Sequence, residues 1–315
     1  MRAKIAIIGL GDIAQKVYLP LLASDERVDI VGLCSRTPAT VERMGRQYRI
    51  AGQYGSVGEL LRRERPDVAF VHSPTPTHEE IVMECLEAGV HVYVDKPLSY
   101  RIEASERMAA FATEHDLLLA VGFNRRFAPL YVEAKRRMAE AGGFDIASAI
   151  KHRTKLQPCP AKQTLYDDLI HMLDLLLWLG GDDGDVISYT ERMDESGRLM
   201  LGTGSLRFAD GSAEGGATGQ FAMARRAGAD LEKLELHGSG CSVEVVNLER
   251  AVWMEQGAAP QELSFGSWDT ILHRRGFAGI VSHVLDTLAD PQACTVRADL
   301  TLPVHRLVER LHPGD

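Results

Sequence analysis

The sequence predicts an α/β protein: an N-terminal Rossmann domain with a doubly wound parallel sheet, then an α/β domain with an open, mostly antiparallel sheet. From Lys4 to about Val121, short apolar runs alternate with longer amphipathic stretches, the pattern of repeated βαβ units. After Gly122, alternating segments follow one another without helices between them, which is typical of antiparallel strands. We therefore expect a dinucleotide-binding domain over residues 1–122 and a second α/β domain over residues 123–315.

Five strands and four helices are expected in the first half. Gly89 follows the third helix, in the place where a glycine commonly ends helices. The predicted strands are Ile5–Ile8, Val28–Leu33, Val68–His72, Val90–Val94 and Leu117–Val121, and the predicted helices are Ala14–Ala23, Ala39–Tyr48, Glu79–Ala88 and Ile102–His115.

The second half is expected to combine one sheet with four helices. Gly, Asp and Ser turns separate its alternating segments. The predicted strands are Asp145–Arg153, Val186–Met193, Leu199–Phe208, Glu214–Met223, Leu231–His237 and Ser242–Asn247, and the predicted helices are Pro129–Glu140, Thr164–Leu179, Thr270–Leu288 and Leu302–Leu311.

Composition and charge describe an ordinary globular chain. Its 315 residues, 45% of them hydrophobic, are enough for two domains with a large core. The net charge of −9 repels nucleic acid and anionic membranes, so neither is expected as a partner. Five scattered cysteines without a CxxC pair predict reduced thiols in a cytoplasmic protein rather than a zinc or dithiol site.

A glycine motif lies directly behind the first predicted strand. In Gly9-x-Gly11-x-x-Ala14, the first glycine allows a tight turn and the second lets the backbone approach a pyrophosphate. The following helix begins near Asp12 and Ile13 and would face the phosphates with its N-terminus. The motif alone is weak, but its place behind an apolar strand at residue nine favours nucleotide binding over a merely structural turn.

The end of the second predicted strand reads Cys34-Ser35-Arg36 and carries no carboxylate. An acid at this position would hold the ribose 2′-hydroxyl of NAD, whereas Ser35 and Arg36 suit the 2′-phosphate of NADP. We therefore expect NADP as the cofactor. The alternative is NAD, in which case Arg36 is an ordinary arginine of a solvated loop.

The loop after the third strand is Ser73-Pro74-Thr75-Pro76-Thr77-His78, and its prolines make it stiff and poor in donors. Next to a nucleotide groove, Ser73, Pro74, Thr75 and His78 are expected to contact the cofactor. A plain loop that caps the next helix is an equally good interpretation of each of them.

Lys96, in Asp95-Lys96-Pro97, follows the apolar run Val90–Val94 directly. That places one lysine at the carboxyl end of a strand, the edge at which open α/β sheets bind ligands. We expect Lys96 to handle a proton and to contact the cofactor.

Asp167, His171 and Asp174 are spaced to share one stripe of a predicted helix, whereas Asp168 faces elsewhere. A carboxylate that orients a neutral imidazole is what a general base needs to take a hydroxyl proton while hydride leaves the same carbon. A surface Asp–His pair is disfavoured by the apolar residues around the stripe. No metal is expected, because no second His or Cys cluster lies nearby in the sequence.

Arg125 and Arg126 lie where the two predicted domains join. Arg125 is expected to contact the cofactor or an oxygen-rich substrate, and an ordinary surface arginine is an equally good interpretation.

Taken together, these motifs resemble the Gfo/Idh/MocA oxidoreductases, and within them the MviM-type branch. The resemblance runs nearly from end to end. It is carried by the glycine motif, Val71-His72-Ser73 with Thr77-His78, Val94-Asp95-Lys96-Pro97-Leu98, Val121-Gly122-Phe123-Asn124-Arg125-Arg126-Phe127-Ala128-Pro129-Leu130, Asp167-Asp168-x-x-His171-x-x-Asp174 with Trp178, and Arg275-Gly276-Phe277.

The resemblance implies that the domain over residues 123–315 binds the substrate and forms a homodimer or homotetramer. It also implies redox chemistry at a hydroxyl carbon of a sugar, polyol or related small molecule. Lys96 then corresponds to the family's catalytic lysine, His171 to its acid/base histidine and Asp167 to the partner carboxylate. Pro97 is expected to follow a cis peptide bond.

Two positions depart from the family pattern: Asp95 replaces the usual glutamate, and Leu169 stands where many members have glycine. Neither change removes a proton-handling group. Leu169 narrows the space beside His171, so the substrate pocket is expected to differ from that of sugar dehydrogenases.

The leading hypothesis is an NADP-dependent oxidoreductase acting on a polyhydroxylated small molecule. The alternative is a non-catalytic sensor that binds NAD(P) on the same fold, since fold and glycine loop do not guarantee turnover. The intact set of Lys96, Asp167 and His171 argues for catalysis. A purely structural module would need neither the glycine loop nor the lysine.

Overall fold

The computed structural model describes residues 2–181, 184–208 and 216–312. Contacts between Cα atoms divide the chain into two compact units. The first comprises residues 1–123 together with 280–302, and the second comprises residues 124–279 and 303–315. The segment 280–302 therefore belongs to the first unit, although it follows most of the second unit in the sequence. A single boundary in the chain cannot separate the two units. That the second unit binds substrate and forms oligomers stays a prediction.

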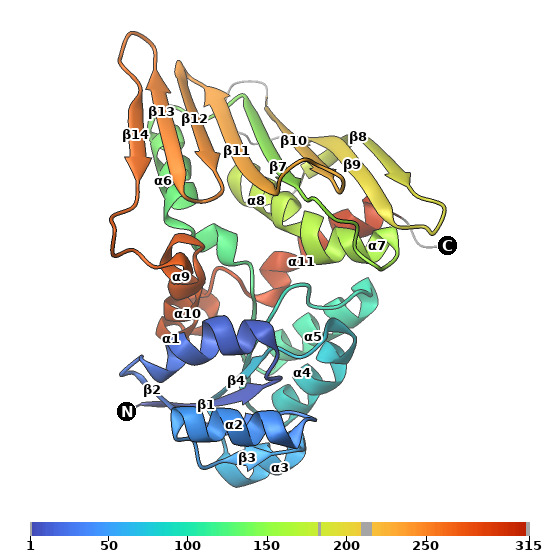
Figure 1. The fold of residues 1–315 in the computed structure, drawn as a ribbon, viewed down its shortest axis with the longest axis vertical. Helices are drawn as coiled ribbons and strands as arrows, with labels where there is room; N and C mark the ends of the chain where they lie inside the picture. Colours follow the sequence, from blue (N-terminus) through green and yellow to red (C-terminus); the bar gives the residue numbers. More distant parts are fainter. Residues whose placement is uncertain (1, 182–183, 209–215, 313–315) are drawn as a thin grey trace. The chain divides into compact units, whose positions relative to one another are not determined.

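The first unit is built on a six-stranded parallel sheet in the order β3-β2-β1-β4-β5-β6 (Figure 1). This is the order of a doubly wound dinucleotide-binding sheet, so the predicted Rossmann domain is confirmed. The strands are β1 (Ala3–Ile8), β2 (Val28–Cys34), β3 (Gln53–Tyr54), β4 (Val68–Val71), β5 (His91–Val94) and β6 (Leu119–Val121). Residues of the central strands are almost fully buried, as expected for a parallel sheet.

The helices between these strands agree with the predicted ones except in two places. The first predicted helix contains a π-helical turn, Ala14–Tyr18, ahead of α1 (Leu19–Ala23). The turn precedes Pro20, which has no N–H to continue an α-helical ladder. The prediction missed β3, because a strand of only two residues shows no periodicity. It also missed α3 (Val57–Glu64), because Gly58 weakens the helix signal. The other helices are α2 (Pro38–Tyr48), α4 (His78–Glu87) and α5 (Ile102–Glu114), with a 3₁₀ turn at Thr75–Thr77.

The second unit contains an eight-stranded sheet in the order β14-β13-β12-β11-β7-β10-β9-β8. Among the described strands of this sheet, only β7 and β10 pair in parallel. The other neighbouring strands of the sheet are antiparallel, as predicted. The strands are β7 (Ile146–His152), β8 (Gly184–Met193), β9 (Leu199–Phe208), β10 (Ala217–Ala224), β11 (Leu231–Gly238), β12 (Cys241–Val246), β13 (Arg250–Glu255) and β14 (Gln261–Ser264). The prediction missed β13 and β14, and the first two residues of its strand at 214–223 lie outside the described residues.

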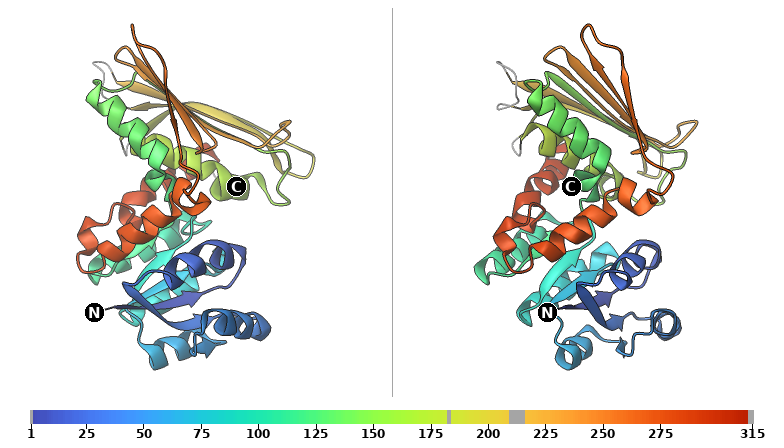
Figure 2. Two further views of the ribbon diagram at one scale, coloured as in Figure 1. Left: turned by 60° about the vertical axis from the view of Figure 1, so that its left-hand side comes forward. Right: turned by 90° about the vertical axis from the view of Figure 1, so that its left-hand side faces the viewer.

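Helices α6 (Pro129–Glu140) and α8 (Ile170–Gly180) pack on one face of this sheet (Figure 2). The predicted helix at 164–179 consists of α7 (Ala161–Thr164), a π-helical turn at Leu165–Leu169 and then α8. The predicted helix at 270–288 is broken into α9 (Ile271–Arg274) and α10 (Phe277–Asp286). Gly276 causes the break: its φ is +79°, and a Cβ there would lie 2.1 Å from the carbonyl oxygen of Asn124. The last helix, α11 (Ala298–Leu311), begins four residues earlier than predicted.

Candidate active site

The register of the parallel sheet brings four predicted loops to one edge of the first unit. Ile8 of β1 pairs with Cys34 of β2 and with Val71 of β4, and Val71 pairs with Val94 of β5. The residues that follow these strand ends therefore lie side by side at the carboxyl edge of the sheet. This is the edge at which open α/β sheets bind ligands.

A groove of about 980 Å³ opens at this edge. Its volume lies at the upper end of the range for small-molecule and cofactor sites, about 300–1,000 Å³. Eight of the predicted cofactor-binding residues line it, namely Gly9, Gly11, Asp12, Ile13, Ser35, Arg36, Ser73 and Pro74. The structure thus gathers the predicted nucleotide contacts in one place, and their binding of a nucleotide stays a prediction.

The two glycines of the loop after β1 have different surroundings. Gly9 has a φ of +87°, and a Cβ there would lie 2.5 Å from the backbone nitrogen of Ser73. Only glycine permits this close approach of the β1 and β4 loops. A Cβ at Gly11 would meet nothing within 4 Å, so this backbone borders open space in the groove.

Ser35 and Arg36 enter the groove directly after β2, as predicted, and Arg36 is exposed. The sequence reading did not anticipate that two carboxylates from α4, Glu80 and Glu84, also line the groove. Nothing in the local sequence signals this, because α4 follows a different strand.

Four predicted cofactor-binding residues do not line this groove. Thr75 lies in the 3₁₀ turn before α4, and His78 is buried at the start of that helix. Lys96 is half-buried in the loop after β5, and its bond to Pro97 is cis, as the resemblance implied. Arg125 belongs to the second unit.

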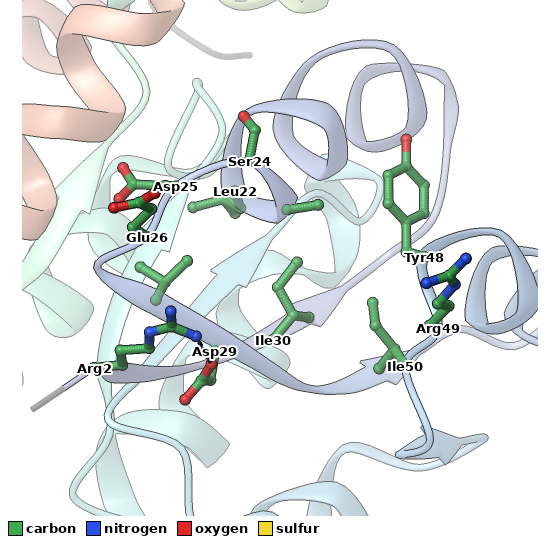
Figure 3. A pocket seen from close by; sticks show the side chains of 12 residues that line it. Arg2, Leu22, Ser24, Asp25, Glu26, Asp29, Ile30, Tyr48, Arg49 and Ile50 are labelled. Atoms are coloured by element: carbon green, nitrogen blue, oxygen red, sulfur yellow. Dashed lines mark hydrogen bonds and ion pairs between the residues drawn. The ribbon is translucent and has the colours of Figure 1, made fainter.

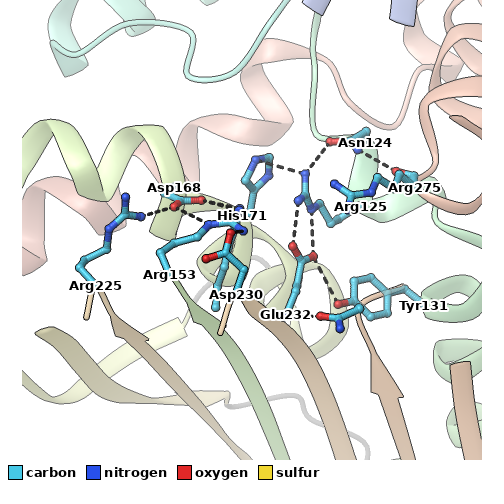
Figure 4. A network of polar contacts seen from close by, with 12 residues as sticks. Asn124, Arg125, Tyr131, Arg153, Asp168, His171, Arg225, Asp230, Glu232 and Arg275 are labelled. Atoms are coloured by element: carbon cyan, nitrogen blue, oxygen red, sulfur yellow. Dashed lines mark hydrogen bonds and ion pairs between the residues drawn. The ribbon is translucent and has the colours of Figure 1, made fainter. Parts of the chain in front are cut away.

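His171 lies on α8 in the second unit and is buried. The guanidinium of Arg125 lies with Nη1 3.3 Å from His171 Nε2, and it also forms two hydrogen bonds of 3.0 and 2.9 Å with the carboxylate of Glu232 (Figure 4). A guanidinium can only donate, so Nε2 of His171 accepts and the ring is neutral. Burial opposes ionisation of Glu232, but Arg125 and Lys151 outweigh it and hold the pKa of Glu232 below its usual value.

The π-helical turn changes the relation among the acids near His171. Asp167 is half-buried within the turn, so the α-helical spacing that placed it on the stripe of His171 does not carry over unchanged, and its predicted role stays a prediction. Asp174 is fully buried, and its Oδ1 lies 2.6 Å from Arg126 Nη2 in a structural ion pair.

Asp168, which the sequence reading set aside, is the centre of a buried ion cluster (Figure 4). Its carboxylate lies 2.6 Å from Lys151 Nζ and 3.2 Å from Arg153 Nε, and it also contacts Arg225. Burial would raise the pKa of Asp168, but Lys151 and Arg153 hold it far below its usual range. The sequence does not predict this cluster, because its members come from different elements: Lys151 lies on β7, Arg153 directly follows β7, and Arg225 directly follows β10.

Lys151 is 1% exposed, and burial lowers its pKa to about 7, an effect to which Arg125 adds. In the unfolded chain a lysine keeps its proton until about pH 10.4, so between pH 7 and pH 10.4 the unfolded state binds more protons at this site than the folded state does.

The contribution of Lys151 to the free energy of unfolding should therefore rise as the pH increases from 7 to 9. Urea unfolding should show this rise in the wild type and a smaller one in Lys151→Met. Exposed Lys155→Met is the control, and parallel curves for wild type and Lys151→Met would contradict the expectation.

A second hollow in the first unit, of about 300 Å³, is a weaker candidate for a functional site (Figure 3). It is lined by Arg2, Asp29 and neighbouring residues at the amino ends of β1 and β2, the edge opposite to the groove.

Within the described ranges, no three His, Cys, Asp or Glu side chains lie close enough together to hold a metal ion. No described helix is long and apolar enough to cross a membrane.

Comparison with known proteins agrees with this geometry. Residues 3–123 match the Gfo/Idh/MocA oxidoreductase family with an NAD-binding Rossmann fold, and residues 129–256 match the YceM-like C-terminal domain. The chain is 34% identical to YceM from Salmonella typhimurium over 98% of this chain and 96% of that protein. It is 27% identical to the myo-inositol 2-dehydrogenase of Thermotoga maritima over 75% and 73% of the two chains.

Among solved structures, a dehydrogenase (MviM) from Clostridium difficile superimposes with a TM-score of 0.91 at 31% identity, covering 99% of both chains. The match extends over both units and therefore includes the YceM-like domain. The chain belongs to the Gfo/Idh/MocA oxidoreductase family and carries a YceM-like C-terminal domain.

Proposed function

We propose that the protein catalyses hydride transfer between a nicotinamide dinucleotide and a hydroxyl or carbonyl carbon of a small polyhydroxylated molecule. The observation that carries the proposal is the groove of the first unit, where the glycine turn, the β2 tip and the β4 loop meet one strand away from the loop of Lys96. Membership of an NAD(P)-binding oxidoreductase family supports it. A homodimer or homotetramer is expected from the same membership.

The groove fits a dinucleotide. Gly9 has no room for a side chain, and Gly11 leaves open space where a phosphate would approach the backbone. The helical segment beginning beyond Gly11 would add the partial positive charge of its N-terminus. A bound nicotinamide would supply or accept the hydride.

The protein's own residues would handle the oxygen and its proton. Lys96 would donate a hydrogen bond to the reacting oxygen and stabilise the negative charge that develops on it. His171 would take or return the hydroxyl proton at Nε2, and the substrate hydroxyl would first displace Arg125 Nη1 from that nitrogen, 3.3 Å away. Asp167 would fix the tautomer of the imidazole.

We further propose NADP as the preferred cofactor, because Ser35 and Arg36 enter the groove where NAD-specific sheets carry an acid. Arg36→Ala should weaken NADPH binding about 10-fold to 100-fold, since a hydrogen bond to a charged group contributes about 1.5–3 kcal/mol, and leave NADH binding nearly unchanged. Fluorescence titration of both cofactors measures this. Arg43→Ala is the matched control, since Arg43 lies on α2, is not among the residues that line the groove, and bonds to Gln15. Equal losses for NADPH and NADH would contradict the assignment.

The substrate class follows from the relatives. Myo-inositol is the substrate named for the Thermotoga maritima enzyme, so inositols, other polyols and sugars are the first compounds to test. Nicotinamide absorbance with these compounds and their keto forms, supplied with NADP(H) and NAD(H), tests the proposal. Tight NADPH binding without turnover would favour the non-catalytic sensor instead.

A further inference from the structure

The loop of Lys96 is held on both sides by histidines from a single segment. His72, directly after β4, approaches Asp95 with 2.8 Å between Nδ1 and Oδ2. His78, at the start of α4, places Nδ1 3.0 Å from the carbonyl oxygen of Pro97. The residues immediately before and after Lys96 are therefore both tied to the chain between residues 72 and 78.

Both histidines are buried and closely packed. The side chain of His72 is completely buried, and the ring of Tyr18 stacks on it with 3.9 Å between the ring centroids. The hydroxyl of Tyr18 in turn lies 2.6 Å from that of Tyr93, the second-last residue of β5. Burial raises the pKa of Asp95, but His72 outweighs this effect and keeps the carboxylate ionised, so His72 donates from Nδ1. The ring of His72 is thus fixed from several sides before it meets Asp95.

The same segment forms one wall of the nucleotide groove. His72, Ser73 and Pro74 line the groove, and His78 places Nε2 2.9 Å from the carbonyl oxygen of Ser73. The segment that borders the groove therefore also contacts the Lys96 loop, through His72 and His78.

We propose that His72 and His78 are positioning residues that hold Lys96 in a fixed place relative to the nucleotide groove. The inference rests on the proposed function in that Lys96 is taken to be the catalytic lysine. His72 acts by holding the carboxylate of Asp95. A neutral ring donates from one nitrogen only, and each nitrogen of His78 faces a carbonyl oxygen, that of Pro97 at 3.0 Å from Nδ1 and that of Ser73 at 2.9 Å from Nε2. We assign the donor to Nδ1, where it would hold the carbonyl group of Pro97.

The two histidines can be tested with paired substitutions of similar size. An asparagine amide can replace the donor at Nδ1, so His72→Asn keeps the contact with Asp95 and His72→Leu removes it. At His78, Asn keeps the donor toward Pro97, whereas Gln moves it to the position of Nε2, toward Ser73. His115→Leu is the control, because His115 also stacks on an aromatic ring, Phe111, but is exposed at the end of α5.

The first readout needs no substrate. Lysines are labelled with ¹³C-methyl groups, the Lys96 signal is assigned with Lys96→Arg, and spectra are recorded with saturating NADPH. A fixed Lys96 should give a sharp signal separate from those of exposed lysines in the wild type, His72→Asn and His78→Asn. In His72→Leu and His78→Gln the signal should broaden or merge with the exposed ones. An unchanged Lys96 signal in these two variants overturns the proposal.

The second readout is turnover. Displacement of a reacting group by about 1 Å can cost about 100-fold in rate, so kcat should fall about 10-fold to 100-fold in His72→Leu and His78→Gln with NADPH affinity kept. His72→Asn should recover most of the loss, which a merely structural role of the imidazole would not predict. If NADPH binds but no substrate turns over, the proposed function fails while the NMR comparison still decides the positioning role.

Discussion

Replacing Lys96 by alanine is expected to lower kcat about 10³-fold while NADPH affinity is nearly kept. A positioned acid or base contributes about 10²-fold to 10⁴-fold to rate, and Lys96 would also stabilise the charge on the reacting oxygen. The lysine does not line the nucleotide groove, so its loss should not disturb the phosphate contacts. Steady-state kinetics beside fluorescence titration of NADPH measure both quantities.

His171→Ala should behave in the same way, because it removes the group that takes the proton. Lys155→Ala, which removes an exposed lysine, controls for the loss of one positive charge. Wild-type turnover in either Lys96→Ala or His171→Ala would refute the role of that residue.

Replacing Asp168 by asparagine is expected to cost about 3–5 kcal/mol of unfolding free energy, the usual cost of removing one partner of a buried ion pair. The carboxylate is contacted by Lys151, Arg153 and Arg225, and two of these three cations are at least nine-tenths buried. Without it, their charges would repel one another in a medium that screens them poorly. Urea unfolding, followed by a spectroscopic signal from the second unit, measures the loss of unfolding free energy.

The matched control for this change is Glu140→Gln, which removes an exposed carboxylate paired with Arg136. Exposed pairs contribute about 0–1 kcal/mol, so this variant should unfold almost like the wild type. Adding Lys151→Met to Asp168→Asn should recover part of the lost stability by removing a buried amine that has lost its carboxylate partner. Equal losses for Asp168→Asn and Glu140→Gln would show that the cluster contributes no more than a surface ion pair.

The first unit could be predicted almost completely because its signals are local. Strand ends, the glycine loop and Lys96 follow one another along the chain, and the parallel register then brings them to one edge. The short strand β3 was missed because two residues have no period. In the second unit, the break at Gly276 was missed because it depends on contact with Asn124, about 150 residues away in the sequence.

The ion cluster of the second unit could not be predicted because its members come from different elements that meet only in the folded protein. Lys151 lies on β7 and Arg225 directly follows β10, and neither is spaced from Asp168 in any recognisable pattern. Helical spacing placed Asp167 rather than Asp168 on the stripe of His171, and both acids lie in a π-helical turn. Predictions from residue spacing assume a regular α-helix, and a π-helical turn does not have that spacing.

The proposed catalytic role of Lys96 is tested most directly by nicotinamide absorbance against time for wild type and Lys96→Ala, with NADPH binding measured on the same preparations. We expect turnover of a polyol, sugar or keto derivative by the wild type, and near-complete loss in the variant at similar NADPH affinity. Equal turnover by both proteins would contradict the catalytic role of Lys96, and NADPH binding without any turnover would contradict the enzyme itself.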